Sequence, residues 1–248
     1  MDELEALRKE NEELKKQNAL KSDWISISAH QLRTSLSAIK WILKMFLDKD
    51  FGELSQEQQS FMRKAFDSTE RLVSLVNEML SLNHAQETLT YNFSSTDIVT
   101  LIDDVVFDFH GESFKKHVGI VFLKPPTEVP NVSCDTEKIR VVLQNLVENA
   151  IKYSAENDSV IISLEPTEKD ITIAVKDTGI GIPESEQPKI FEKFYRAHNA
   201  KEKDSIGSGL GLFTTKSIVE AHGGKIWFES DGATGTTFYV SLPYQKAS

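Results

Sequence analysis

The chain has 248 residues, of which 40% are hydrophobic, enough for one large or two medium domains with an ordinary core. Its formal net charge of -10 argues against a nucleic-acid partner, because phosphate binding needs clustered Lys and Arg in excess. Cys134 is the only cysteine, so no intramolecular disulfide can form, and we expect a reducing, cytoplasmic compartment. No apolar run approaches the roughly 18 residues that span a bilayer, and there is no signal peptide, so we expect no membrane insertion.

Residues 1–21 predict a parallel two-stranded coiled coil. Positions spaced alternately three and four apart form a heptad seam, made of Leu4, Leu7, Asn11, Leu14 and Asn18. Asn at two seam positions costs stability but favours two strands in register, so we expect a homodimer. The alternative is a lone charged helix. The regular period and the lack of ligand residues are typical of an appended zipper.

Residues 22–87 predict two antiparallel helices. The first should end near Asp48, where DKDFGELS supplies a turn, and Ser55 with Gln58 forms a capping box that opens the second. The second helix should run to about Ala85, with an apolar stripe for core packing made of Phe61, Ala65, Leu72, Val76, Met79 and Leu80. Two such hairpins, dimerised by the zipper, would form an antiparallel four-helix bundle.

One histidine interrupts the pattern of the first helix, in SISAHQLRTSLSAIK. If the heptads continue, Leu32 and Ile39 fall in the seam and His30 points away from it. Thr34 lies one turn above His30 on the same face, and Gln31 flanks it. A single surface histidine usually has no special role, so this segment alone leaves its function open.

Helical periodicity is lost after Gln86, and we expect a linker over residues 88–96. Residues 97–248 then mix helix and strand patterns, with helices at about 97–116, after Asp135 and at 211–221, and with strands at VGIVFL, near Val132, and in the pairs SVIISLEP with DITIAVKD and GKIWFES with TTFYVSL. This grouping predicts an α+β fold in which helices cover one face of a mixed sheet, an α/β sandwich.

The helix EKIRVVLQNLVENAIKYS has two distinct faces. Asn145, Asn149 and Lys152 project on one side, and the opposite side is apolar, with Ile139, Leu143, Leu146 and Ala150. An Asn carbonyl oxygen suits Mg²⁺, which is often held partly by phosphates, and a lysine ammonium suits those phosphates. A solvated polar face remains an equal alternative on this evidence.

Glycine-rich segments follow in the second half of the chain. In DTGIGI, Gly179 and Gly181 permit positive φ and the close approach of a flat ligand, and Asp177 can accept a hydrogen bond from an amine such as adenine N6. In FEKFYR, Arg196 precedes AHNAKEKDSI, whose composition favours a mobile lid over a packed element. GSGLGL leads straight into a helix, an arrangement that binds phosphate.

Taken together, these segments resemble the cytoplasmic core of two-component sensor histidine kinases over about residues 22–245. HQLRTSLS resembles the phosphoacceptor box, NLVENAIKY the N box, FEKFYR the F box, and DTGIGI, GSGLGL and GATGTTF the three glycine boxes. The resemblance implies a dimerisation and histidine-phosphotransfer domain joined to a Bergerat-type ATP-binding domain. It also implies ATP and Mg²⁺ as cofactors, phosphorylation of His30, and a response regulator receiver domain as the partner.

The resemblance assigns nucleotide contacts position by position. Asn149 would hold Mg²⁺, with Asn145 beside the metal and the triphosphate. Lys152 would contact phosphate and Tyr153 would line the nucleotide. Asp177 would recognise adenine.

It also assigns residues of the lid and of the third glycine box. Arg196 would steady the γ-phosphate, and Thr236 would support the pocket near Asp177. The return hinge of the lid would consist of Gly207, Gly209 and Gly211, with Leu210 in the same loop.

The phosphoacceptor box departs from the family pattern at two positions. Gln31 stands where the family usually has an acidic residue able to take the Nδ1 proton, so we expect slower phosphorylation of His30. Ser35 stands where proline is common, and we expect an altered balance between kinase and phosphatase states, because proline kinks a helix. Thr34 would orient water for dephosphorylation of the regulator, or else only bond back to its own helix.

Two functions of other classes remain open. A gyrase-like or chaperone-like ATPase clamp would share the glycine boxes but would not need a hairpin with an outward histidine. A catalytically silent dimeric scaffold could bind a regulator through its helices without transferring phosphate.

Overall fold

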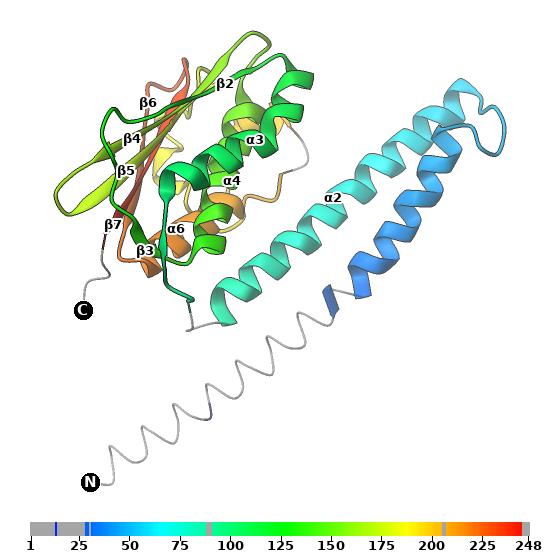
Figure 1. Ribbon diagram of the computed structural model, residues 1–248. Helices are drawn as coiled ribbons and strands as arrows, with labels where there is room; N and C mark the ends of the chain where they lie inside the picture. Colours follow the sequence, from blue (N-terminus) through cyan, green and yellow to red (C-terminus); the bar gives the residue numbers. More distant parts are fainter. Residues whose placement is uncertain (1–12, 14–27, 30, 88–90, 205–206, 245–248) are drawn as a thin grey trace. The chain divides into compact units, whose positions relative to one another are not determined.

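The computed structural model describes residue 13 and residues 28–29, 31–87, 91–204 and 207–244 (Figure 1). The chain divides into two compact units, residues 1–89 and residues 90–248 apart from 206–208. The coiled coil predicted over residues 1–21 lies outside the described residues, except for Glu13, and so does His30.

The first unit contains a helical hairpin. One helix covers residues 31–47, and α2 covers Gln56–Glu87. The capping box is confirmed, because the Ser55 backbone N–H donates to Gln58 Oε1 at 2.9 Å and the Gln58 N–H donates to Ser55 Oγ at 3.2 Å. Lys40 Nζ lies 2.6 Å from Glu70 Oε1 and joins the two helices.

The apolar stripe predicted on α2 is only partly buried within one chain. Val76 is buried and packs with Ala29, with Leu36 beside them, but Phe61 and Leu72 are 60% and 47% exposed. A two-helix hairpin has too few neighbours to cover a stripe of this width. Among the stripe residues whose side chains are described, only Val76 is buried within one chain.

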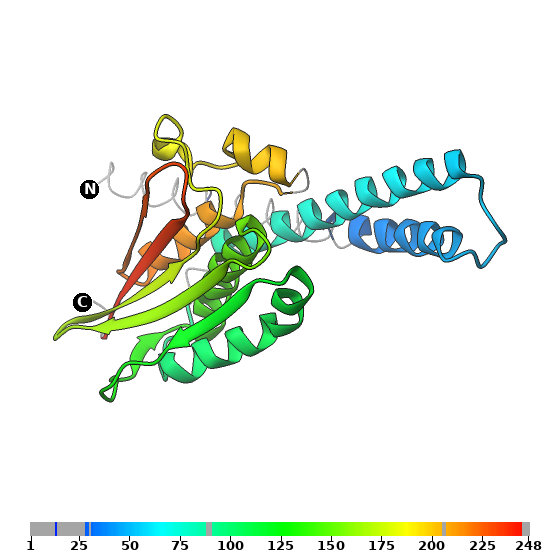
Figure 2. The same ribbon diagram turned by 90° about the horizontal axis from the view of Figure 1, so that it is seen from above.

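The second unit is an α+β sandwich, as predicted. A five-stranded sheet has the order β2-β4-β5-β7-β6, in which β2 and β4 are parallel and the other neighbours antiparallel. Its strands are β2 (Gly119–Leu123), β4 (Ser159–Pro166), β5 (Asp170–Lys176), β6 (Lys225–Ser230) and β7 (Thr236–Pro243). One face of the sheet is covered by helices α3 (Ile98–Lys116), α4 (Thr136–Tyr153) and α6 (Gly211–Ala221), as Figure 2 shows from above.

Burial along the strands alternates, as expected for a sheet with one covered face. In β5, Ile171, Ile173 and Val175 are at most 1% exposed and point toward the helices, while their neighbours are less buried. The apolar face of α4 meets them and is buried as predicted, with Ile139, Leu143, Leu146 and Ala150 at most 4% exposed. Cys134 is fully buried in the same core.

Three short elements were not expected from the sequence. β1 (Ser94–Thr96) pairs with β3 (Val132–Cys134) and lies within the segment 88–96 expected to be a linker. Three residues are too few to reveal a period of two, so the pattern carries no signal. The stretch expected to be an irregular lid contains a helix, α5 (His198–Lys203), and a 3₁₀ turn, η1 (Gln187–Lys189), precedes it.

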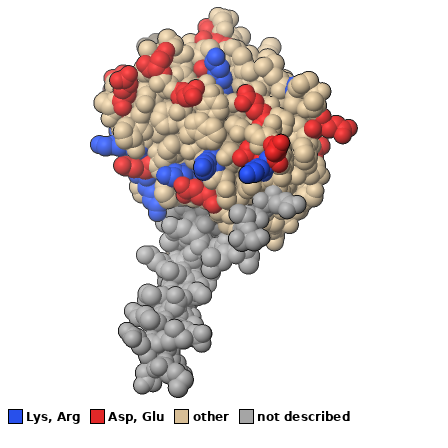
Figure 3. Space-filling model, turned by 90° about the vertical axis from the view of Figure 1, so that its left-hand side faces the viewer, with Lys and Arg blue, Asp and Glu red and all other residues tan. Residues whose placement is uncertain are grey.

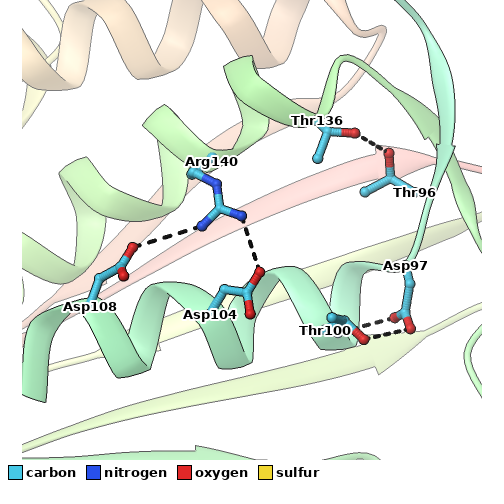
Figure 4. Close-up of polar contacts among 7 residues, drawn as sticks. All are labelled: Thr96, Asp97, Thr100, Asp104, Asp108, Thr136 and Arg140. Carbon is cyan, nitrogen blue, oxygen red and sulfur yellow. Dashed lines mark hydrogen bonds and ion pairs between the residues drawn. The ribbon is translucent and has the colours of Figure 1, made fainter.

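Polar contacts hold α4 against α3 (Figure 4). Arg140 on α4 lies 3.1 Å from Asp104 and 3.8 Å from Asp108 on α3. The hydroxyl groups of Thr96 and Thr136 are 2.6 Å apart at the start of α4. These contacts, together with the buried face of α4, fix the orientation of its opposite, polar face.

Charged side chains of both signs are interspersed on the face of the molecule in Figure 3. Among the described residues, no helix has the length and apolar content needed to cross a membrane.

Candidate functional site

The polar face of α4 forms one wall of the candidate site. Asn145, Asn149 and Lys152 are partly exposed on the side opposite the core, as the helical arithmetic predicted. Asn145 Nδ2 approaches Thr215 Oγ1 of α6 at 3.5 Å, and a Cβ built on Gly211 would lie 3.6 Å from Asn145 Oδ1. The first turn of α6 therefore lies directly against the N-box face of α4.

Asp177 follows β5 and is 7% exposed. Its Oδ1 accepts hydrogen bonds from the N–H of Gly179 at 2.9 Å and of Thr236 at 3.2 Å. Burial raises the pKa of the carboxyl group, although these two hydrogen bonds lower it. Both bonds from described residues go to Oδ1, which leaves Oδ2 to accept from a ligand. Thr236 and Asp177 are also joined through the backbone at 2.9 Å, so the structure brings this predicted pair together.

Glycine is needed where the glycine boxes approach neighbouring backbone. A Cβ on Gly179 would lie 2.3 Å from the Tyr153 carbonyl oxygen at the end of α4. Gly235 has a φ of +113°, and a Cβ there would lie 2.2 Å from the Asp177 carbonyl oxygen. Any side chain would force these segments apart, so Gly179 lets the first glycine box lie against the end of α4, and Gly235 lets the third glycine box lie against Asp177.

Helix α5 is fixed at several points. The N–H and Nδ1 of His198 lie 2.9 and 3.0 Å from the carboxylate oxygens of Glu186. Asn199 Nδ2 donates to the Gly181 carbonyl at 3.1 Å, and Lys203 Nζ donates to the carbonyls of Tyr153 at 2.6 Å and Ser154 at 2.9 Å. No local sequence pattern indicates these contacts, because they join segments that are separated in the chain.

Two cations meet at the end of α5. Lys152 Nζ lies 2.5 Å from Asp204 Oδ2, and Arg196 Nη2 lies 3.6 Å from the same oxygen. Arg196 also donates to the carbonyl oxygens of Ala200, at 3.1 Å, and of Asp204. The structure thus brings together the two side chains that the sequence assigned to phosphate, and it adds Asp204, which the sequence analysis did not single out.

The second glycine box connects this cluster to α6. The Gly209 carbonyl accepts from the Phe194 N–H at 3.0 Å, and Leu210 is 2% exposed at the N-cap position of α6. Gly211 is the first helical residue, so the free N–H groups of the first turn and the positive end of the helix dipole face the Asn145 side of α4. Gly207 lies in the preceding loop.

The acceptor segment belongs to the other unit. Gln31 and Thr34 are exposed on the helix over residues 31–47. Ser35 Oγ donates to the Gln31 carbonyl at 3.1 Å, and the helix continues through this position.

The sheet, its three helices and the glycine-rich loops define an ATP-binding domain of the class that histidine kinases share with gyrase and chaperone ATPases. Residues 134–246 match the family model described as histidine kinase-, DNA gyrase B- and HSP90-like ATPase, which implies ATP as the nucleotide. Residues 20–88 match the His Kinase A (phospho-acceptor) domain. The chain belongs to the sensor histidine kinase family.

Individual relatives agree with this assignment. The sensor histidine kinase WalK of Bacillus subtilis is 32% identical over 237 residues, which cover 94% of this chain and 38% of WalK. The catalytic domain of histidine kinase ThkA is 31% identical with a TM-score of 0.54, covering 62% of this chain and 98% of that one. A crystal structure of ThkA in complex with response regulator protein TrrA gives 25% identity and a TM-score of 0.64, covering 98% of this chain and 66% of that one. The chain spans only part of its curated relatives, 38% of WalK and 62% of the kinase SasA of Prochlorococcus marinus.

Proposed function

We propose that the protein transfers the γ-phosphate of ATP to His30 and then to an aspartate of a response regulator. The observation that carries this proposal is the convergence of Asn145, Lys152, Asp177 and Arg196 around α4 and α6, in a chain that also has a phosphoacceptor domain. Neither feature alone requires a kinase. Other ATPases share the nucleotide site, and a silent scaffold could retain the phosphoacceptor domain.

The nucleotide contacts follow from the chemistry of the side chains. The free Oδ2 of Asp177 would accept from adenine N6, with Gly179 and Gly181 admitting the flat ring and Tyr153 lining it. Lys152 and Arg196 would bind phosphate oxygens, and the first turn of α6 would add backbone donors after the hinge, made of Gly207, Gly209, Leu210 and Gly211. Thr236 would keep Asp177 in place.

Amide oxygens on α4 fit a magnesium ion. Mg²⁺ prefers oxygen ligands and is commonly held by few protein groups together with phosphates and water. Asn149 would be its protein ligand and Asn145 would lie beside it. When bound, the ion would offset the charge of the triphosphate.

In the proposed reaction, Nε2 of His30 attacks the γ-phosphorus. A bond forms between nitrogen and phosphorus, the bond to the β,γ-bridging oxygen breaks, and ADP leaves with that electron pair. The Nδ1 proton must pass to a base, and Gln31 can orient the ring but cannot accept that proton. We therefore expect Gln31→Glu to phosphorylate His30 faster, and an unchanged rate in a time course would contradict this role.

A second copy of the chain is the proposed partner for the hairpin. Leu32 and Ile39, which the heptads place in the seam, are 51% and 47% exposed in one chain, and Phe61 and Leu72 of the α2 stripe are also exposed. Joining two hairpins would bury these apolar surfaces in a four-helix bundle.

A response regulator receiver domain is the proposed second partner. The crystal structure of ThkA with TrrA supports this proposal, since the similarity to ThkA covers 98% of this chain. Thr34 would orient water for removal of phosphate from the regulator. Ser35, by keeping the helix regular, would shift the ratio of kinase to phosphatase activity, and Ser35→Pro with an unchanged ratio would refute this.

Incubation with γ-labelled ATP tests the proposed function. We expect acid-labile label on the wild-type protein and none on His30→Gln, and we expect the label to move to a receiver domain. Release of free phosphate without labelled protein would indicate an ATPase clamp instead. ATP binding without any transfer, also in Gln31→Glu, would indicate a silent scaffold.

A further inference from the structure

We propose that Asp204 is an internal competitor for the phosphate-binding cations, so that the triphosphate of ATP must displace its carboxylate from Lys152 and Arg196. This inference rests on the proposed function, because it takes these two cations as the phosphate site. Asp204 would thereby lower the affinity of the site for nucleotides that carry phosphates, relative to its affinity for a nucleoside without them.

The geometry places a single carboxylate oxygen between both cations. Asp204 Oδ2 lies 2.5 Å from Lys152 Nζ and 3.6 Å from Arg196 Nη2. The three side chains are 18%, 21% and 10% exposed, so water screens their charges less than at an open surface. A phosphate oxygen that approaches Lys152 would meet this carboxylate at the same ammonium group.

Backbone contacts hold the carboxylate in this place. Asp204 is the C-cap residue of α5, and its N–H donates to the Ala200 carbonyl at 3.1 Å. Arg196 donates to the carbonyl oxygens of both Ala200 and Asp204. The guanidinium group therefore fixes the backbone at the end of α5 while it faces the Asp204 carboxylate.

The charge of a ligand determines whether it competes with Asp204. A triphosphate carries several negative charges and many oxygens, and it can replace one carboxylate at both cations. Its binding energy is reduced by the ion pairs that it breaks. Adenosine has no phosphate and leaves the pairs intact, so its affinity should not depend on Asp204.

Displacement of the Asp204 carboxylate would leave α5 in place. The remaining anchors of α5, Asn199 on the Gly181 carbonyl and Lys203 on the Tyr153 carbonyl, do not involve the two cations. Phosphate binding would therefore displace the Asp204 carboxylate while Asn199 and Lys203 still hold α5 at both ends.

The test compares Asp204→Asn with a matched control, Glu202→Gln. Glu202 is exposed on the same helix, so the control changes the net charge equally without touching Lys152 or Arg196. Calorimetric titrations of the full chain use ATP, ADP and adenosine, each with and without Mg²⁺. We expect Asp204→Asn to bind ATP and ADP about three- to tenfold more tightly, with adenosine unchanged and the control like the wild type.

A double variant tests whether the gain in ATP affinity in Asp204→Asn depends on the Lys152 ammonium group. In a Lys152→Met background, Asp204→Asn should give a gain in ATP affinity that is clearly smaller than in the wild type. Unchanged or weaker ATP binding by Asp204→Asn would overturn the inference, and so would an equal gain for adenosine. If the wild type binds no adenosine or ATP, the proposed function fails. If affinity changes as expected but His30 takes no label, only the transfer step of that function fails.

Discussion

The hairpin and the sandwich bury their apolar residues in different ways. The sandwich has a complete core in one chain, in which Ile162, Ile173 and Leu146 are at most 1% exposed. The hairpin leaves large apolar side chains in contact with solvent, among them Trp41 at 64% and Ile42 at 48%. Burial of apolar groups drives folding, so the sandwich can fold as a single chain. The hairpin needs a second apolar surface, from outside its own chain, to cover its exposed side chains.

The largest expected effect is the weakening of dimerisation by a charged residue placed in the seam between the two hairpins. Ile39→Asp puts a carboxylate on a side chain that is 47% exposed in one chain but buried in the proposed bundle. Two buried, unpaired carboxylates per dimer should weaken dimerisation by several kcal/mol, about a hundredfold or more in the dissociation constant. Analytical ultracentrifugation measures this constant.

Phe107→Asp is the matched control for the seam. Phe107 is 77% exposed on α3, in the sandwich, so the same change of an apolar group to a carboxylate should leave dimerisation unchanged. Equal dissociation constants for Ile39→Asp and the wild type would remove the argument that the hairpin needs a second copy.

The second effect compares the same truncation in both regions. Ile162→Ala removes atoms from a site that is 1% exposed and should cost about 2–5 kcal/mol of unfolding free energy, independent of protein concentration. Ile42→Ala should show a cost that grows with protein concentration, because Ile42 is 48% exposed in one chain and would be buried only in the proposed dimer. Chemical denaturation at several concentrations separates the two; a concentration-independent loss for Ile42→Ala would contradict the comparison.

The third effect concerns binding rather than folding. In Asp177→Asn, the amide oxygen would have to accept from Gly179 and Thr236, which turns the amide N–H₂ toward the donor at adenine N6. We expect affinity for adenosine to fall about tenfold or more, with the unfolding free energy not reduced. Isothermal titration and denaturation of the same samples check both points.

The affinity for adenosine should depend on pH through the protonation of the Asp177 carboxyl group. Burial raises the Asp177 pKa above its ordinary value of 3.8, so on acidification this carboxylate gains a proton at a higher pH than an exposed aspartate does. Binding should weaken as the pH falls toward the raised pKa. Stability should change in the opposite sense: within the window between 3.8 and the raised pKa, the native state binds the proton more readily, so stability decreases as pH rises. Both dependences should be reduced in Asp177→Asn.

The smallest expected effect tests how much local sequence contributes to the hairpin. Ser55→Ala removes the side-chain acceptor of the Gln58 N–H and should cost about 1 kcal/mol. Glu57→Gln, at an exposed position of the same first turn, keeps both hydrogen bonds of the capping box and should cost less. A Ser55→Ala protein as stable as the wild type would mean that packing alone starts α2.

Local patterns in the sequence predicted most of the elements. The capping box at Ser55, the strands on both sides of the turn after Pro166, and the start of α6 at Gly211 each depend on residues within a few positions. The two faces of α4 followed from the helical repeat alone, which is why Asn145 and Lys152 could be assigned to a site and Leu143 to the core. The glycine boxes are equally local signals, since their conformations exclude most other residues.

The sequence by itself therefore determined the class of the fold, the polar face of α4 and the order of the site segments, because each is written in neighbouring residues. Only the tertiary structure decided which groups meet across the sheet and the lid: Thr236 on Asp177, Lys203 on the end of α4, and Asp204 on the two cations. Apart from the contact of Asp204 with Arg196, these contacts join residues between 50 and 59 positions apart, and no local pattern records them. A charged stretch whose composition favoured a mobile lid thus proved to contain a helix, because the partners that hold it lie elsewhere in the chain.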